Sequence, residues 1–414
     1  MKLFKFFTFF VVLIVISICA SVCARPDDGK CIFTLPNDVP KNEPIYLNKQ
    51  ANNLTIFRPS GQVNRFSSNE KLHLFCPGKK NFIQIKGENV SLNSAEVVCN
   101  NRQFQINGFG NVNFSEVNCT KGVQTEIKIK RHKCSRTGRI IEVGFKMANN
   151  NFLETFKVCF ENETLSPLWS NHIINGKFIN FNVKERSRRE FKATGFPSDA
   201  SPSEAYKKTV QINHFKELIG IKQTVTYFSS TSYLARGHLT PDADFVFPSA
   251  QWSTYFYINA SPQFQSVNSG NWLRVENLAR KLAQSYNVDM EIWTGMYEIL
   301  KLENSRGELE MMYLSANGKY PVPKWLWKIV KNTSTNSAIV FITLNDPYRS
   351  VDEVEEFCPN VCAKASVDTK HFKTMTQGYT FCCDLTDFRQ VIRVLSPEAT
   401  AHNLLSCSNI RLVA

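Results

Sequence analysis

The sequence predicts an α+β protein in which a small, disulfide-rich all-β domain precedes a larger domain with a mixed or antiparallel sheet and flanking helices. Short β-rich segments, separated by turn residues and cysteines, fill the chain up to about residue 150. Beyond that point, one long amphipathic helical pattern is followed by several apolar strand patterns. A chain of 414 residues is also too long for one ordinary hydrophobic core, which independently favours two domains.

Residues 1–24 are typical of a secretory signal. Lys2 and Lys5 form a basic start, and an apolar run follows from Phe6 to Ile18. The segment Val22-Cys23-Ala24 supplies small residues for cleavage. A retained membrane anchor is the alternative, but the apolar run is short for a span. We therefore expect a secreted, extracellular protein with domains at residues 25–150 and 151–414.

The charge of the chain indicates a class of partner. The formal net charge is +13, and loss of Lys2 and Lys5 with the signal lowers it to +11. A basic secreted protein attracts polyanions such as nucleic acid, heparin-like glycans or anionic membranes. Charge alone does not choose among these three.

The cysteines indicate disulfides. Eleven of the 13 lie outside the signal, and they fall into two groups. The first group is Cys31, Cys76, Cys99, Cys119, Cys134 and Cys159; the second is Cys358, Cys362, Cys382, Cys383 and Cys407. In an oxidising compartment the six can pair among themselves, whereas five leave one thiol free or paired elsewhere. A zinc site in the second group is a weaker alternative, because adjacent cysteines are awkward tetrahedral ligands.

Glycosylation sequons support secretion. They begin at Asn53, Asn89, Asn113, Asn118, Asn162 and Asn332. A seventh begins at Asn259, which we expect to stay unmodified because that residue is also a candidate site residue.

The N-terminal part has a strand pattern but no motif that indicates chemistry. The expected strands lie at 81–85, 95–99, 103–106, 126–129 and 140–145. Residues 128–133 form a very basic run, read either as a solvated strand edge or as a contact for nucleic acid or glycan.

The C-terminal part alternates strands with one clear helix. We expect strands at 155–160, 254–258, 291–294, 310–314, 325–330 and 338–344. Residues 268–286 predict an amphipathic helix, since Trp272, Val275, Ala279 and Leu282 recur at helical spacing.

The residues that best indicate function are Arg236, His238, Asn259, Asn268 and Glu276. Arginine and histidine flank a glycine in an expected turn, where the missing side chain permits close approach. Histidine can accept a proton from water near neutral pH, arginine can hold a phosphate, and oxygen ligands of low charge suit hydrated Mg²⁺. Each residue also has an ordinary reading as a structural histidine, a turn residue or part of a solvated helix face. Together they favour phosphodiester hydrolysis.

Residues from about 155 to 400 resemble the DNA/RNA non-specific endonucleases, the ββα-metal nucleases typified by the secreted Serratia enzyme, with secreted arthropod relatives in saliva or digestion. The resemblance rests on several motifs in the right order. They are Arg189-Glu190-Phe191, Arg236-Gly237-His238, Asn259-Ala260-Ser261-Pro262-Gln263, and Asn268-Ser269-Gly270-Asn271-Trp272 followed by Glu276. Trp293-Thr294-Gly295 and residues 323–328 also look like family strands.

This resemblance implies a role for each residue. His238 is the general base, and Arg236 and Arg189 neutralise charge in the transition state. Arg189 is the weakest assignment, because Arg186 and Arg188 lie close enough to compete. Asn259 orients the site.

The resemblance also implies a metal, a substrate and products. Asn268 binds Mg²⁺ directly, with Mn²⁺ as an alternative, and Glu276 holds a metal-bound water. The substrate is DNA, with RNA as a further candidate, and the products carry 5′ phosphates. Neither an obligate protein partner nor a membrane contact is expected.

One departure from the family pattern bears on activity. Many members carry Asp before Arg-Gly-His, whereas this chain has Ala235. The alternative hypothesis is therefore a secreted polyanion-binding or DNA-binding protein with a weakened site. A zinc-dependent hydrolase is less consistent with the sequence, because no His-x₃-His or Cys/His cluster lies near His238.

Overall fold

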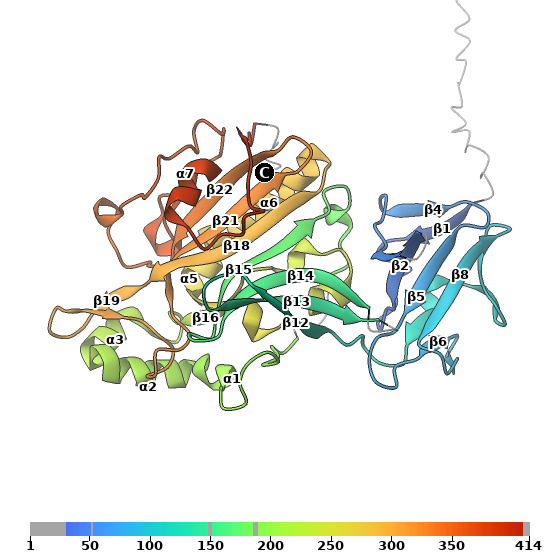
Figure 1. The fold of residues 1–414 in the computed structure, drawn as a ribbon, viewed down its shortest axis with the longest axis horizontal. Helices are drawn as coiled ribbons and strands as arrows, with labels where there is room; N and C mark the ends of the chain where they lie inside the picture. The colour runs from blue at the N-terminus through green and yellow to red at the C-terminus, as the bar shows by residue number, and fades with distance from the viewer. Residues whose placement is uncertain (1–29, 51–52, 148–150, 185–188, 409–414) are drawn as a thin grey trace, which may run out of the picture.

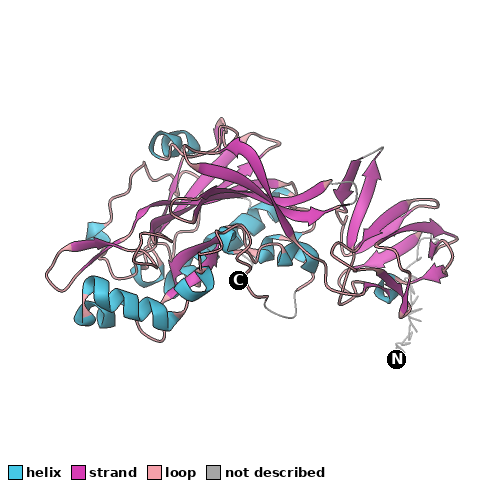
Figure 2. Cartoon of the chain, turned by 60° about the horizontal axis from the view of Figure 1, so that its bottom comes forward, coloured by secondary structure: helices cyan, strands magenta, loops and turns pink. Residues whose placement is uncertain are grey.

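The computed structural model describes residues 30–50, 53–147, 151–184 and 189–408. The chain forms an N-terminal β part beside a larger α+β part, and all seven α-helices that the described residues form belong to the larger part (Figures 1 and 2). This arrangement confirms the predicted α+β class with an N-terminal β region. The expected signal at residues 1–24 lies outside the described residues. Within the described ranges, no helix has the length and apolar character needed to cross a membrane.

The N-terminal part consists of short strands in three small sheets. The two-stranded sheet pairs β1 (Cys31–Thr34) with β4 (Val63–Phe66). The six-stranded sheet has the order β10 (Gly110–Val112), β9 (Gln103–Ile106), β8 (Ser94–Asn100), β5 (Lys71–Phe75), β2 (Ile45–Gln50), β3 (Asn53–Ile56). The three-stranded sheet has the order β11 (Val117–Cys119), β6 (Ile83–Ile85), β7 (Glu88–Asn89). Disulfides Cys31–Cys99 and Cys76–Cys119 cross-link this part internally.

A nine-stranded sheet forms the centre of the larger part. Its order is β12 (Glu126–Lys133), β13 (Gly138–Lys146), β14 (Phe152–Glu161), β15 (Ser166–Ile174), β18 (Met290–Ile299), β21 (Pro323–Asn332), β22 (Ser337–Leu344), β23 (Thr380–Cys383), with β24 (Asn403–Leu404) also paired to β22. All of these pairings are antiparallel except that of β22 with β24.

The change from one sheet system to the other falls between β11 and β12, earlier than the expected division at residue 150. β13 pairs with β14 along its whole length, and Cys134–Cys159 links the segment before β13 to β14. We therefore propose that the domain division lies near residue 125. The basic run 128–133 becomes the edge strand of the large sheet, where Lys128 and Lys130 pair with Glu142.

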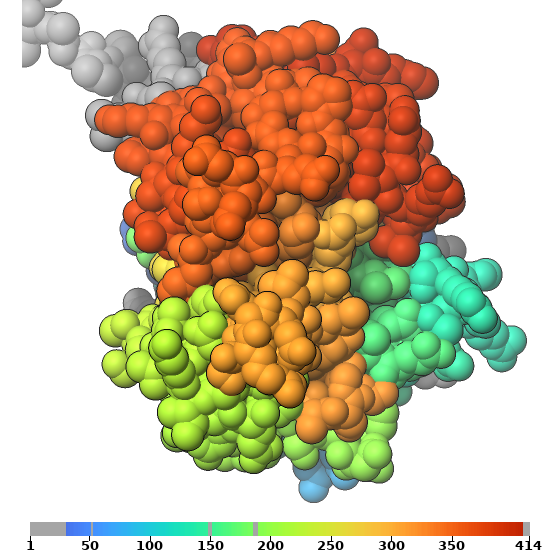
Figure 3. Space-filling view, turned by 90° about the vertical axis from the view of Figure 1, so that its left-hand side faces the viewer, coloured from blue at the N-terminus to red at the C-terminus, as the bar shows by residue number. Residues whose placement is uncertain are grey.

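Both faces of the large sheet are covered. On one face lies α6 (Asn271–Tyr286), which buries Trp272, Val275 and Ala279 against apolar residues of the sheet. On the other face, Trp293 and Trp327 pack with α7 (Leu385–Val391) and the C-terminal segment. The remaining elements are α1 (Pro202–Ala205), α2 (Lys208–Ile219), α3 (Ile221–Tyr227), α4 (Pro248–Trp252), α5 (Gln265–Asn268), the hairpin β16 (Leu234–His238) with β17 (Ala260–Phe264), and the hairpin β19 (Lys301–Glu303) with β20 (Leu309–Met311). The α2–α3 pair and the β19–β20 hairpin form the end of the molecule farthest from the N-terminal part (Figures 1 and 3).

Three expected elements were wrong in detail. The strand expected at 310–314 already ends at Met311. The segment 254–258 is not a strand; it runs through turns into a short 3-10 helix at Tyr257–Asn259, and the strand begins at Ala260. The expected helix 268–286 is two helices, because the chain breaks at Ser269–Gly270. A Cβ atom at Gly270 would overlap the carbonyl oxygen of Ser266, so the close approach of the two helices requires glycine.

The cysteine prediction is confirmed. The first six cysteines pair among themselves, and Cys358–Cys383 and Cys362–Cys382 pair in the second group. Cys407 remains a buried free thiol, as an odd count requires.

Candidate active site

Arg236 and His238 lie on β16, not in the turn that the sequence suggested. β16 pairs antiparallel with β17, so that His238 faces Ala260 and Ala235 faces Gln263 across the hairpin. Alternation along a strand places side chains i and i+2 on one face. The ring of Phe191 contacts both side chains, lying 4.9 Å from the His238 ring and 5.6 Å from the Arg236 guanidinium. The two sequence-predicted residues are therefore brought together.

Gly237 is explained by the neighbouring strand. A Cβ atom there would overlap the side-chain amide of Gln263, which is fully buried and donates to Ser261 Oγ at 2.9 Å. The missing side chain at residue 237 thus makes room for a protein amide, rather than for substrate as the sequence alone suggested.

The imidazole of His238 is half-buried and has aromatic neighbours on two sides. Phe191 lies on one side, and the ring of Tyr255 meets it edge-on at 5.0 Å. The Tyr255 hydroxyl donates to Asp242 Oδ2 at 2.6 Å, which ties the ring to the loop after His238. This packing restricts the orientation of the imidazole, which a general base requires.

The two arginines lie against different aromatic rings, Arg236 against Phe191 and Arg189 against Trp252. Arg236 is exposed and donates to the Tyr257 hydroxyl at 3.3 Å. Arg189 is also exposed, with its guanidinium 4.0 Å from the centre of the Trp252 ring. Its competitors Arg186 and Arg188 lie outside the described residues.

Asn259 is fully buried, and its amide is used entirely within the protein. Its Oδ1 accepts from the backbone N–H of Thr240 at 2.9 Å, and its Nδ2 donates to the carbonyls of Thr240 at 2.8 Å and Thr254 at 3.0 Å. Asn259 therefore shapes the loop that follows His238 and has no polar atom left over for substrate.

Asn268 and Glu276 end up on successive helices, α5 and α6. Both side chains are half-buried, and neither forms a hydrogen bond or an ion pair with a residue of the described ranges. Burial raises the pKa of the Glu276 carboxyl to about 7, against the opposing charges of Lys328 and Arg280. A half-buried amide oxygen and carboxyl without protein partners fit a cation with its waters.

A buried polar network, formed by residues that the sequence analysis did not predict, accompanies the candidate site residues. Asp244 accepts from Arg280 at 2.6 Å and contacts His172 Nε2 at 2.8 Å. Burial raises the pKa of the Asp244 carboxyl, but Arg280, His172 and Lys328 outweigh it and bring the value to about 2. Burial lowers the pKa of His172 below its usual value. The imidazole of His172 also contacts Thr240 Oγ1 at 3.3 Å, which fixes the loop from a second side.

Lys328 joins this network to the residue that follows β16. Its buried Nζ donates to Thr294 Oγ1 at 2.6 Å and to the carbonyl of Leu239, next to His238, at 3.5 Å. Burial lowers the pKa of Lys328, and the charges of Asp244 and Glu276 oppose that shift. Two signals were available in the sequence: a lysine inside an apolar strand needs buried partners, and Arg280 lies four residues after Glu276 on the same helical face. His172 gave no such signal.

Comparison with known proteins shows the family to which this chain belongs. Residues 136–388 match the family model described as DNA/RNA non-specific endonuclease. The chain belongs to the DNA/RNA non-specific endonuclease family. The resemblance inferred from Arg236-Gly237-His238 and its companion motifs is thereby confirmed, and the protein is a nuclease that hydrolyses phosphodiester bonds.

Insect salivary proteins are among the relatives of this endonuclease. It is 33% identical to a salivary endonuclease of Lutzomyia longipalpis over 89% of this chain and 85% of that protein. It is 31% identical to salivary protein Tsal1 of Glossina morsitans morsitans, over 84% of this chain and 86% of that protein. A salivary endonuclease of Culex quinquefasciatus is 26% identical over 66% of this chain and 71% of its own.

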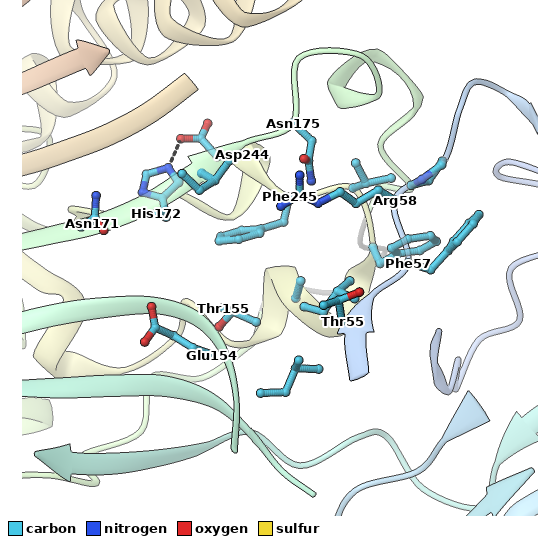
Figure 4. Close-up of a pocket in the computed structure, with 17 residues that line it drawn as sticks. Thr55, Phe57, Arg58, Glu154, Thr155, Asn171, His172, Asn175, Asp244 and Phe245 are labelled. Atoms are coloured by element: carbon cyan, nitrogen blue, oxygen red, sulfur yellow. Dashed lines mark hydrogen bonds and ion pairs between the residues drawn. The ribbon is translucent and has the colours of Figure 1, made fainter. Parts of the chain in front are cut away.

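A cavity of about 310 Å³ lies at the boundary between the two parts of the endonuclease (Figure 4). Thr55, Phe57 and Arg58 line it from the N-terminal part, and His172, Asn175 and Asp244 line it from the larger part. The figure shows the His172–Asp244 pair at its wall. His238, Asn268 and Glu276 are not among its lining residues, so this cavity lies behind the candidate site and is separate from it.

Proposed function

We propose that this endonuclease is a secreted, Mg²⁺-dependent and sequence-non-specific enzyme that cuts extracellular DNA into fragments with 5′ phosphates, with RNA as a second substrate to be tested. The observation that carries the proposal is the joint contact of Phe191 with His238 and Arg236 on one face of β16. This contact holds a proton acceptor beside a phosphate-binding group.

His238 is the proposed general base. Its imidazole takes a proton from water, and the water oxygen attacks phosphorus opposite the 3′ oxygen of the preceding nucleotide. The P–O3′ bond breaks, the leaving 3′ oxygen takes a proton from solvent to become a hydroxyl, and the phosphate stays on the 5′ side of the next nucleotide. General-base catalysis of this kind contributes roughly 10²–10⁴-fold to the rate.

Asn268, through its amide oxygen, and Glu276, through a water molecule, are the proposed metal-holding residues. Both side chains lack hydrogen-bond and ion-pair partners among the described residues. When bound, Mg²⁺ supplies positive charge that stabilises the phosphate and the leaving oxygen. Mn²⁺ is the alternative ion, because the same oxygen ligands suit it.

Arg236 and Arg189 are proposed to neutralise the charge that builds up on the phosphate oxygens. Both guanidiniums are exposed beside the aromatic cluster, and each already has one face on an aromatic ring. Contacts of this kind bind the phosphate and do not distinguish one base from another, which supports cleavage without sequence preference.

Secretion is proposed from independent features. The first 24 residues read as a signal, and five disulfides form among the described residues. The relatives in sand fly, tsetse fly and mosquito are salivary proteins by name. Extracellular DNA is then the substrate that such an enzyme meets.

The test is incubation of the secreted protein with supercoiled plasmid in Mg²⁺, in EDTA, and as the His238→Ala variant. We expect short fragments only with Mg²⁺ and intact His238, and fragment ends that a ligase joins without prior phosphorylation. Plasmid that shifts on a gel and stays whole would instead support the polyanion-binding alternative that Ala235 suggests.

A further inference from the structure

We infer that the N-terminal β part forms one wall of a groove that binds the sugar–phosphate backbone of a nucleic acid strand beyond the cleavage site. The inference rests on the proposed function, because it describes how the substrate of the proposed active site is held. It assigns to residues 30–125 a part in substrate binding.

The groove lies between the two parts of the chain and has a volume of about 990 Å³. Its charged lining residues are all basic: Lys41 from the N-terminal part, and Lys184 and Arg189 from the larger part. Amides of Asn37, Asn42 and Asn182 and the ring of Trp252 complete its polar and aromatic surface. Cations with uncharged hydrogen-bonding groups and an aromatic ring form a surface that suits a phosphate backbone.

Neither lysine of the groove has an ion-pair partner among the described residues. Both Lys41 and Lys184 are exposed. Two acids that neighbour lining residues in the sequence accept from backbone N–H groups: Asp38 from Thr34 at 2.6 Å, and buried Glu43 from Ser249 at 2.7 Å. The positive charge of the groove is thus available to a polyanion.

The wall from the N-terminal part is fixed, because the two parts share one hydrophobic cluster. The ring of Tyr46 packs 5.2 Å from that of Phe247, and Trp252 belongs to the same cluster. Arg58 forms an ion pair with Asp289 across the boundary. A wall held by buried aromatic contacts presents its lysine in a constant position relative to the catalytic strand, which avoids an ordering cost on binding.

The groove leads directly to the candidate active site. A Cβ atom at Gly122 would lie 3.5 Å from Trp252 and 3.8 Å from Arg189, so the end of the N-terminal part touches the Arg189–Trp252 stack. Arg189 lies two residues before Phe191, the ring beside His238. Two residues span at most about 7 Å of extended chain, which is about two nucleotide steps along a duplex axis.

This continuity favours a nucleic acid strand over a sulfated glycan as occupant. A strand cut at His238 must continue on at least one side of the scissile phosphate, and the groove offers cations that include Arg189, two residues before Phe191. A sulfated glycan has no phosphodiester bond that would place it in the cleavage site beside the groove.

The test measures DNA binding in the His238→Ala background, so that cleavage does not intervene. The variants are Lys41→Glu, Lys184→Glu and the double variant. The charge-matched controls are Arg65→Glu on β4 and Lys301→Glu on β19, both exposed and outside the groove lining. The probes are a labelled duplex of about 30 base pairs, a labelled trinucleotide and a heparin oligosaccharide, each titrated over a salt series.

We expect each groove variant to weaken duplex binding about 5- to 10-fold near 0.1 M salt and to reduce the slope of log Kd against log salt by about one, whereas the trinucleotide loses little. The controls should leave both quantities near the parent values. Equal losses in Arg65→Glu would mean that net charge alone acts. Weaker binding of heparin by the groove variants, with no change for the duplex, would assign the groove to a glycan. Either result overturns the inference.

A failure of the proposed nuclease function can be distinguished from a failure of the groove proposal. In that case the parent protein with intact His238 leaves DNA uncut, although the binding series can still give the expected pattern. In the active background, the double variant should raise KM for long DNA with kcat unchanged, and unaltered melting temperatures exclude misfolding as the cause. Unchanged KM for long DNA would contradict a groove that holds the strand.

Discussion

The side-chain amide of Asn259 forms hydrogen bonds with both polar backbone groups of Thr240, its N–H and its carbonyl. Its Oδ1 accepts from the Thr240 N–H at 2.9 Å, and its Nδ2 donates to the Thr240 carbonyl at 2.8 Å. Because Thr240 lies two residues after His238, this double hydrogen bond fixes the point at which the chain leaves β16. The proposed role of Asn259 is therefore to position the strand end that carries the base.

The variant Asn259→Ala should fold less stably and cleave more slowly. It leaves both polar backbone groups of Thr240 buried without partners, which we expect to cost about 2–4 kcal/mol in the free energy of unfolding. Displacement of His238 should lower kcat at least about tenfold, because small misplacements of catalytic groups are costly, while KM changes little. Urea unfolding and steady-state cleavage measure the two effects.

Asn64 supplies the matched control. It is a buried asparagine of the N-terminal part whose amide also binds backbone groups, at Ser60, Phe33 and Gly61. Asn64→Ala should destabilise that part and leave kcat of the folded protein unchanged. A normal kcat in Asn259→Ala would remove the positioning role.

The variant Ala235→Asp tests the departure from the family pattern. Ala235 precedes Arg236, so strand alternation points its Cβ to the face of β16 opposite His238. We expect the added carboxylate to change kcat by less than about fivefold, because it acts on the base only through the strand. A gain of about a hundredfold would show that a supporting carboxylate was missing and would strengthen the weakened-site hypothesis.

Much of the fold followed from periodicity, because buried strands and amphipathic helices leave repeating apolar patterns. The strands at 103–106 and 338–344 were placed to within a residue, and 325–330 lies within the longer β21. The helix break at Gly270 was missed because the apolar spacing continues across it. The carbonyls of Ser266 and Gln377, which a Cβ atom at residue 270 would overlap, show why glycine is needed. The division that we propose near residue 125 does not follow from the strand patterns, because they do not indicate which sheet a strand joins.

The site was predictable in part for a related reason. Arg236, His238, Asn268 and Glu276 stand in a recognisable motif order, so residue types alone indicated them. Their spatial support is non-local: His172 comes from β15 and reaches the loop after His238 only through the folded sheet. Lone buried polar residues of this kind carry no sequence pattern, and the structure is needed to find them.

The Asp244 carboxyl predicts loss of stability in acid. Its pKa falls from 3.8 to about 2 on folding, so it contributes stability that is present above pH 3.8 and lost as the pH falls toward 2. The pKa of His172 is lowered too, and that contribution is lost as the pH falls below 6.5. Asp244→Asn should therefore destabilise the protein at pH 7 by roughly 2 kcal/mol and flatten the decline at low pH.

Thermal unfolding followed between pH 7 and pH 2 checks this prediction. Asp352→Asn is a suitable control, because Asp352 is exposed and forms no ion pair within the described chain. Its profile should match that of the unaltered protein. Parallel profiles for Asp244→Asn and the unaltered protein would mean that the buried pair does not titrate as proposed.

Glycans should occupy the sequons whose asparagine is exposed, and not those whose asparagine is buried. Asn53, Asn89, Asn113 and Asn162 are exposed, whereas Asn259 and Asn332 are buried and hydrogen-bonded through their amides. We expect glycans on the first four and none on the last two, because the folded chain offers no access to a buried amide. Peptide mapping after enzymatic deglycosylation in heavy-oxygen water measures each site, and a glycan on Asn259 would be incompatible with its contacts to Thr240.

The variant Asn268→Ala should weaken metal binding before anything else. Its amide has no partner among the described residues, so its removal should leave the free energy of unfolding in EDTA within about 0.5 kcal/mol of the parent. The rise in melting temperature that Mg²⁺ produces should shrink, because the protein then loses its direct ligand. Cleavage should fall at least about a hundredfold, comparable to the loss of a catalytic group, and excess Mg²⁺ should restore only part of it. Asn268→Asp keeps an oxygen at the same position and should retain the Mg²⁺-induced rise. If Asn268→Ala bound Mg²⁺ as tightly as the parent in calorimetry, the metal would have to lie elsewhere, and Glu276 with Asp242 would be the next residues to test.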